Sequence, residues 1–160
     1  MSAETFTTKL VALYRTKGLT LATAESCTGG LVAAAITSVP GSSAVLDRGF
    51  VTYSNAAKTE LLGVPATLID SVGAVSEAVA RHMAQGAKQQ AGTDLAVSVT
   101  GIAGPDGGSP EKPVGTVWFG LATADGRVCT HHRLFPGNRQ AIRTASTLYA
   151  LQLLWDGANS

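Results

Sequence analysis

Segments typical of buried strands alternate with helical patterns, and this alternation limits the fold of the chain more than any other feature. Short runs rich in apolar and β-branched residues occupy positions 19–24, 48–53 and 95–100. Apolar residues at helical spacing predict helices over positions 3–17, 31–36, 55–62, 76–90 and 138–155. Such alternation is typical of a sheet with parallel strands and helices on both faces.

The last two strand-type runs, positions 115–122 and 127–135, are separated by a turn that contains Asp125 and Gly126. An Asp-Gly pair between two such runs is a strong signal for an antiparallel hairpin. A chain of 160 residues has the length of one domain. The sequence therefore predicts a single three-layer α/β/α domain over residues 1–160. Its mixed central sheet would include an antiparallel hairpin near the C-terminus.

The charges of the chain are few and balanced. There are 12 basic and 11 acidic residues, and charged residues make up 14% of the total, whereas soluble domains have roughly 25%. No two Lys or Arg residues are adjacent, so the basic cluster typical of a nucleic-acid binder is missing. We therefore expect no nucleic-acid partner. The low charged fraction favours a homo-oligomer, most simply a dimer, that hides part of the surface.

No stretch reaches 18 uninterrupted apolar residues, and the first residues lack the apolar core of a signal peptide. We therefore expect no membrane insertion and a cytoplasmic location. Two cysteines, Cys27 and Cys129, are too few for a disulfide framework. His131 and His132 are neighbours in a strand-type run, so their rings should point to opposite faces. The sequence predicts no metal and no other cofactor.

A turn with a nucleophilic side chain follows the first predicted strand, and a helical pattern begins directly after it. Free N–H groups at a helix N-terminus bind phosphates and oxyanions. Paired glycines let a ligand approach the backbone. An ordinary capped helix would have a similar composition. The candidates in this segment are Glu25, Ser26, Cys27, Thr28, Gly29 and Gly30.

A second candidate segment joins the run 48–53 to the next helix. Tyr53 ends the run, Asn55 is an expected N-cap, and Lys58 lies one turn into the helix. A lysine with a lowered pKa acts as a general base in Ser–Lys enzymes. Any such pair would have to form across the fold, between Ser26 and Lys58. A solvated helix lysine is the ordinary alternative.

The run 95–100 leads into a glycine-rich loop. Ligand sites of α/β domains lie at such strand ends, although a loop of this kind can also be a plain connection. Asp106 is more typical of a turn former than of an acid catalyst. The candidate binding residues are Thr100, Gly101, Gly104, Gly107 and Gly108.

Arg139 and Arg143 lie four residues apart at the start of the last predicted helix, which Asn138 would cap. Two positive charges near a helix N-terminus are slightly unfavourable by themselves. A bound phosphate would offset that cost. Two solvated arginines are the alternative interpretation.

Four segments in this order resemble the CinA C-terminal domain family. They are positions 24–30, 49–58, 73–76 and 100–117. Within that family, the resemblance is to the stand-alone nicotinamide-nucleotide amidases, and it covers about residues 5–155. It implies hydrolysis of the carboxamide of nicotinamide mononucleotide to nicotinic acid mononucleotide and ammonia, in pyridine nucleotide salvage. It also implies that no metal is needed.

The resemblance further implies roles for three residues. Ser26 would be the nucleophile, Lys58 its general base, and Tyr53 a neighbour that relays or positions a proton. Backbone N–H groups around positions 27–29 or at Gly101 would hold the tetrahedral oxyanion.

The 5′-phosphate of such a substrate needs hydrogen-bond donors. Arg139, Arg143 and the glycine loop at 104–108 are the candidates. Two alternatives stay open on the sequence. One is a non-catalytic nucleotide- or phosphate-binding regulatory module of the same family. The other is a Ser–Lys hydrolase that acts on a different amide or ester.

Overall fold

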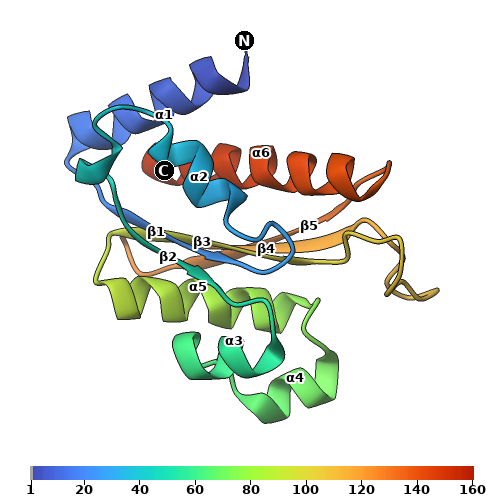
Figure 1. Cartoon of the computed structure of the whole chain (residues 1–160). Helices are drawn as coiled ribbons and strands as arrows, with labels where there is room; N and C mark the ends of the chain where they lie inside the picture. The colour runs from blue at the N-terminus through green and yellow to red at the C-terminus, as the bar shows by residue number, and fades with distance from the viewer. Residues whose placement is uncertain (1) are drawn as a thin grey trace.

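The computed structural model describes residues 2–160 and consists of a mixed five-stranded sheet between two layers of helices (Figure 1). The strand order is β2-β1-β3-β4-β5. The first three strands are parallel, and β4 and β5 are antiparallel additions. The predicted mixed sheet with a C-terminal hairpin is therefore confirmed. The strands are β1 (Leu21–Glu25), β2 (Leu46–Val51), β3 (Leu95–Gly101), β4 (Thr116–Ala122) and β5 (Val128–Leu134).

Helices cover both faces of the sheet, as predicted (Figure 1). One layer consists of α1 (Ala3–Lys17), α2 (Leu31–Thr37) and α6 (Arg139–Ala158). The other consists of α3 (Asn55–Leu62), α4 (Ala66–Val72) and α5 (Glu77–Ala91). A short 3-10 helix, Ser42–Ala44, precedes β2. The helix α4 has no counterpart among the predicted elements.

Capping side chains fix where several helices begin. The Ser76 side chain accepts a hydrogen bond from the backbone of Val79 at the start of α5, and Asn138 caps α6, as predicted. The N-cap of α3 is Ser54, and the expectation of Asn55 is wrong by one residue. Ser54 has the extended backbone of a cap, and Asn55 is already the first helical residue.

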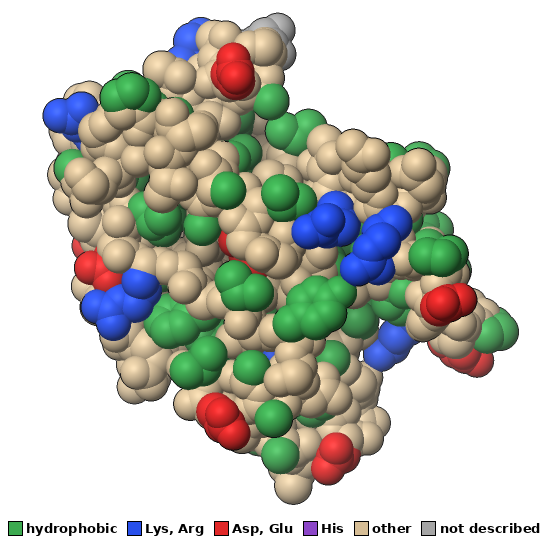
Figure 2. Space-filling view, viewed as in Figure 1, with side chains coloured by type: hydrophobic (Ala, Val, Ile, Leu, Met, Phe, Trp, Pro, Cys, Tyr) green, Lys and Arg blue, Asp and Glu red, His purple; other side chains and the backbone are tan. Residues whose placement is uncertain are grey.

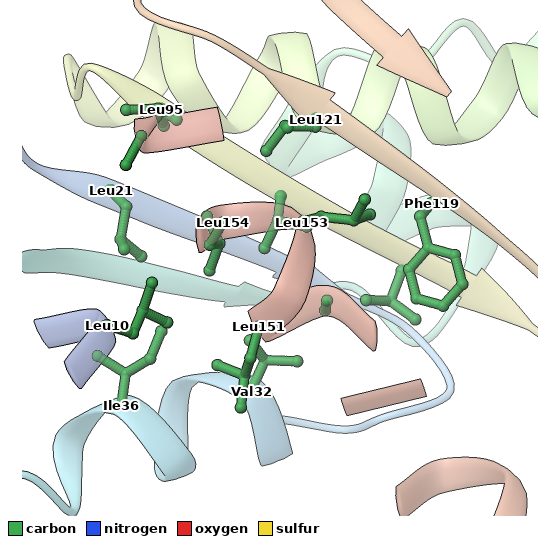
Figure 3. Close-up of a cluster of buried hydrophobic side chains, with 14 of the residues drawn as sticks. Leu10, Leu21, Val32, Ile36, Leu95, Phe119, Leu121, Leu151, Leu153 and Leu154 are labelled. Atoms are coloured by element: carbon green, nitrogen blue, oxygen red, sulfur yellow. The ribbon is translucent and has the colours of Figure 1, made fainter. Parts of the chain in front are cut away.

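Large apolar side chains fill the space between the sheet and the layer of α1, α2 and α6 (Figure 3). Alternate residues of β3 and β4 point into this core, because side chains alternate between the faces of a strand. Fully burying a Leu or Phe side chain contributes about 1.5–3 kcal/mol. The labelled core residues in Figure 3 include Leu10, Leu21, Ile36, Leu95, Phe119 and Leu154.

Small residues line the opposite face of the sheet, so the backbone of α5 lies directly on it. A Cβ at Gly120 would come within 2.4 Å of the Ala80 carbonyl oxygen. The hydroxyl of Ser98 donates to that same carbonyl, and the hydroxyl of Thr100 donates to Ala74. These contacts hold the segment that leads into α5 beside the end of β3.

None of the helices formed by residues 2–160 is long and apolar enough to cross a bilayer. Figure 2 shows hydrophobic side chains near the middle of one face, with Lys and Arg side chains directly beside them. The exposed large apolar residues of the chain include Leu31, Val51 and Tyr53. Of these three, Tyr53 also lines the pocket described next.

Candidate active site

A pocket of about 290 Å³ lies where the three parallel strands end. Ser26 follows β1, Tyr53 follows β2 by two residues, and Gly101 ends β3. Because the carboxyl ends of parallel strands share one edge of a sheet, these positions converge. The pocket is lined by nine of the predicted residues: Ser26, Cys27, Tyr53, Lys58, Thr100, Gly101, Gly104, Gly107 and Arg139.

Ser26 and Lys58 are in direct contact. Nζ of Lys58 lies 3.2 Å from Oγ of Ser26, which is within the reach required for proton transfer. Ser26 is partly accessible, whereas the Lys58 side chain is buried. A substrate could therefore reach the hydroxyl while the amine stays shielded from water.

The segment between β2 and α3 wraps its carbonyl oxygens around the Lys58 amine. Nζ lies 2.8 Å from the carbonyl of Thr52, 3.3 Å from that of Tyr53 and 3.4 Å from that of Ser54. Burial lowers the pKa of Lys58 from its usual 10.5 because it penalises the charged form. A neutral amine has two N–H bonds for these carbonyls and a lone pair left for the Ser26 hydroxyl.

Cys27 also lines the pocket, but its environment does not favour a nucleophile. Burial raises the pKa of the Cys27 thiol to about 11. The thiol is therefore protonated near neutral pH, and the thiolate is the reactive form. Its sulfur packs against β3, since a Cβ at Gly101 would lie 3.1 Å from it.

The side chains of Glu25 and Thr28 are not among the pocket walls, and they support α2. One carboxylate oxygen of Glu25 accepts hydrogen bonds from the Thr28 hydroxyl at 2.6 Å and the Val32 N–H at 2.9 Å. The other oxygen accepts from the Ala33 N–H at 3.1 Å. Glu25 therefore satisfies free donors at the start of α2. Both residues were expected to bind substrate, but their side-chain partners are within the chain.

Arg139 spans the mouth of the pocket. Its guanidinium donates to the Gly104 carbonyl at 2.7 Å and to the Tyr53 hydroxyl at 3.0 Å. The structure therefore directs the Tyr53 hydroxyl to Arg139, whereas the Tyr53 carbonyl contacts Lys58. Arg139 is exposed and joins the glycine loop to the segment after β2.

Arg143 does not line the pocket. It reaches from α6 to the turn after Ser26, where its Nε donates to the Cys27 carbonyl at 3.0 Å. A second nitrogen lies 3.4 Å from the Thr28 carbonyl. Gly29 and Gly30 adopt positive φ angles of 61° and 111° in the same turn, which glycine adopts without strain. These two glycines shape the turn and, like Arg143, are not among the pocket walls.

Gly108 also lies outside the pocket walls. A Cβ there would come within 2.8 Å of the Val114 backbone nitrogen, so the glycine allows the loop to fold back on itself. Six pocket residues were not predicted as site residues. Four had no chemical signal in the sequence, Asn55 had been assigned to a helix cap, and Asp106 had been assigned to a turn. They are Asn55, Ala74, Val75, Ile102, Ala103 and Asp106.

The two neighbouring histidines of β5 lie on different faces of the sheet, as expected. His131 packs near the Tyr149 ring of α6, and His132 stacks on Trp118. Among residues 2–160, no three His, Cys, Asp or Glu side chains come together as metal ligands. Cys27 and Cys129 are free thiols.

The fold and the pocket define an α/β domain whose serine and buried lysine meet at the carboxyl ends of parallel strands. The profile of the CinA C-terminal domain matches residues 3–157. The chain therefore belongs to the CinA C-terminal domain family, and the resemblance seen in the sequence is confirmed.

Curated relatives agree with this assignment. The chain is 60% identical over 141 residues to "Nicotinamide-nucleotide amidohydrolase PncC" of Enterobacter agglomerans. The aligned region covers 88% of this chain and 86% of the relative. Its identity to the protein of the same name from Escherichia coli K12 is 57%, with the same coverage. A "CinA-like protein" of Geobacter sulfurreducens is 57% identical over 94% of this chain, which corresponds to 36% of that longer protein.

Solved structures support the same family assignment. The "competence/damage inducible protein CihA" of Agrobacterium tumefaciens superposes with a TM-score of 0.95 at 44% identity, and the match covers 100% of both chains. A "Competence-Damaged Protein (CinA) Superfamily Protein" of Klebsiella pneumoniae gives a TM-score of 0.94 at 35% identity over 99% of each chain.

Proposed function

We propose that this protein hydrolyses the carboxamide of nicotinamide mononucleotide to nicotinic acid mononucleotide and ammonia. It is a hydrolase that acts on an amide, as are the curated amidohydrolases to which it is 57–60% identical. The contact between Oγ of Ser26 and Nζ of Lys58 is the observation that carries the mechanism. A buried lysine beside a partly accessible serine can supply the base and the nucleophile of an amidase.

The first half of the reaction forms an ester on Ser26. Neutral Lys58 takes the hydroxyl proton while Oγ attacks the carboxamide carbon, and the carbonyl oxygen becomes an oxyanion. The C–N bond then breaks, and the Lys58 ammonium returns the proton to the leaving amine, which departs as ammonia. Burial serves this step because it lowers the pKa of Lys58 and keeps the base form available.

The second half releases the acid. A water molecule attacks the ester carbon, and Lys58 accepts its proton. The bond between the acyl carbon and Oγ then breaks, and Lys58 returns the proton to Ser26. The product is a carboxylic acid, which loses its proton to water and leaves as the carboxylate, and the resting dyad is restored. The same pair thus serves both halves in reversed roles.

The turn after Ser26 supplies candidate donors for the oxyanion. Among the described residues, the N–H groups of Cys27 and Thr28 donate to no oxygen atom. The N–H groups of Ser26 and Gly29 are already used, by Val99 and Ser26 respectively. Loss of one oxyanion donor typically costs about 10²–10³ in rate, so these two N–H groups are central to the proposal.

Arg139 and the glycine loop are the proposed partners of the 5′-phosphate. Arg139 is the arginine among the pocket walls, and the loop contributes Gly104 and Gly107. A guanidinium pairs well with a phosphate because its donors form a planar fork. Arg139 would exchange one of its present bonds, to Gly104 or Tyr53, for the substrate.

We further propose that the reaction belongs to pyridine nucleotide salvage in the cytoplasm and that the enzyme works as a homo-oligomer. The exposed free thiol of Cys129 suits a reducing compartment. The small charged fraction suits a chain that hides surface in an assembly. Small-angle scattering of the purified protein would test the assembly.

The test of the dyad compares Lys58→Met with Lys9→Met, an exposed lysine of α1. Chromatography of the products should show conversion to the acid by wild type and Lys9→Met, and none above background by folded Lys58→Met. Binding of the nucleotide by the wild type without conversion would favour the non-catalytic module. Conversion of another amide but not of this nucleotide would favour a hydrolase with a different substrate.

A further inference from the structure

Arg143 was a candidate ligand of the substrate phosphate, but its contacts indicate a different role. It is half-buried, lies outside the pocket walls and donates to two backbone carbonyls of the turn after Ser26. A Cβ at Gly29 would lie 3.2 Å from its terminal nitrogen, so the guanidinium packs directly on the turn. Two nitrogens of the guanidinium are therefore already engaged with the backbone of the turn.

The peptide geometry of the turn links Arg143 to the oxyanion donors. A trans peptide is planar, so the carbonyl of one residue and the N–H of the next point in opposite directions. The Cys27 carbonyl accepts from Nε of Arg143 at 3.0 Å. The N–H of Thr28 therefore points away from Arg143, and it donates to no oxygen among the described residues.

The preceding peptide is fixed in a similar way. The Ser26 carbonyl accepts from the N–H of Gly29 at 3.0 Å, which directs the N–H of Cys27 to the opposite side. Arg143 approaches the turn from α6, whereas Ser26 and Cys27 face the pocket. Each of these two N–H groups is thus oriented by the bond that the carbonyl of its own peptide accepts, from Gly29 in the first peptide and from Arg143 in the second.

We propose that Arg143 is a positioning residue that holds the Cys27–Thr28 peptide with its N–H directed at the oxyanion. The inference deepens the proposed amidase mechanism and rests on it. Arg143 does not touch the substrate; it acts through the backbone of the turn. Without it, the peptide could rotate and present a carbonyl oxygen where the reaction develops negative charge.

The role predicts a specific kinetic pattern for Arg143→Gln. Misplacement of a catalytic group by about 1 Å can cost 10²-fold in rate, so kcat should fall by about 10- to 100-fold. KM should change little, because the phosphate has other partners. Arg143→Lys keeps the charge but lacks the planar guanidinium fork that spans the two carbonyls, so its kcat should lie between those of wild type and Arg143→Gln.

A fluorophosphonate provides a readout that needs neither the nucleotide nor its phosphate. Ser26 attacks its phosphorus, the P–F bond breaks, fluoride leaves, and the serine proton passes to Lys58. The phosphoryl oxygen of the adduct occupies the oxyanion position. The rate of Ser26 labelling, measured by intact-protein mass spectrometry, should therefore fall in Arg143→Gln by a factor similar to that for kcat.

The matched control is Arg127→Gln, in the hairpin turn at the far end of β4, where Arg127 pairs with Asp125. It should keep both rates. Circular dichroism at the assay temperature would identify a variant that is unfolded, in which case Arg143→Lys carries the comparison.

The outcomes separate the two proposals. A parallel loss of kcat and of labelling supports the positioning role. A raised KM with unchanged labelling overturns it and makes Arg143 a substrate ligand. If wild type is labelled but releases no ammonia from the nucleotide, the proposed substrate fails, and the labelling rates alone decide the role of Arg143. If wild type neither releases ammonia nor is labelled at Ser26, both proposals fall.

Discussion

Oγ of Ser26 and Nζ of Lys58 lie 3.2 Å apart, although 32 positions separate the two residues in the chain. They meet because β1 and β2 are parallel neighbours and both strands end at the same edge of the sheet. The chain then turns back into α3, and the carbonyls of residues 52–54 hold the amine in place. The pairing therefore depends on the strand order as much as on the two residues.

The pH dependence of the reaction should report the environment of Lys58. Burial disfavours its ammonium form, so the base form is populated at lower pH than for a free lysine. The value of kcat/KM should rise with pH as Lys58 loses its proton, and the midpoint of that rise should lie below 10.5. A rise centred at or above 10.5 would contradict the role of Lys58 as general base.

Gly101→Ala should disturb the site, because its new methyl group would crowd the end of β3. A Cβ there would lie 2.7 Å from Cγ2 of Val117, 3.0 Å from the Thr116 carbonyl and 3.1 Å from Sγ of Cys27. Relief of these contacts would move Cys27, which is adjacent to the nucleophile. We expect a loss of kcat of about 10-fold or more, measured by steady-state kinetics. Gly126→Ala is a suitable control, since a Cβ at Gly126 meets nothing within 4 Å, and it should affect stability only through its turn.

Glu25→Ala should chiefly affect stability. The change removes the acceptor of the Thr28 hydroxyl and of the Val32 and Ala33 N–H groups, and it leaves a void in a buried site. Unpaired buried donors cost about 1–3 kcal/mol each when they stay unsatisfied, so the free energy of unfolding should fall by about 2–4 kcal/mol. Urea denaturation would measure it. An unchanged midpoint would show that Glu25 does not support α2.

Substitutions of Arg139 and of Tyr53 should have different effects on KM and kcat. Arg139→Gln removes the bonds to Gly104 and Tyr53 and the charge at the pocket mouth, so KM for the nucleotide should rise. Tyr53→Phe removes only the hydroxyl that contacts Arg139. Its loss of kcat should therefore stay below the roughly 10²-fold typical of a group that transfers a proton. A larger loss of kcat in Tyr53→Phe would restore Tyr53 as a proton relay.

Much of the fold could be predicted because the local sequence patterns agree with the topology that the chain adopts. Strand-type runs bounded by glycine, serine or asparagine, and the Asp125-Gly126 turn, fixed the order and type of the main elements. The helix α4 was missed because it buries only Ile69 and includes polar residues throughout, whereas the equally short α2 begins with a continuous apolar run up to Ile36. Ser54 and Asn55 are both good caps, and only the backbone angles decide between them.

The candidate site was predictable where chemistry follows a strand end, as at Ser26 and Gly101. The site was less predictable where a side chain beside a site residue supports a helix or a turn and does not face the pocket. Glu25 adjoins the nucleophile in sequence, yet α2 turns back so that its N–H groups meet the carboxylate. Arg139 and Arg143 look equivalent four residues apart, but the path of α6 across the turn brings one to the pocket and the other to the backbone behind it.

The decisive experiment measures ammonia release from nicotinamide mononucleotide in EDTA, with wild type and Ser26→Ala side by side. We expect release by wild type and none above background by Ser26→Ala, with both proteins equally folded by circular dichroism. Equal release by the two proteins would contradict the assignment of Ser26 as nucleophile. No release by folded wild type would contradict the proposed reaction itself.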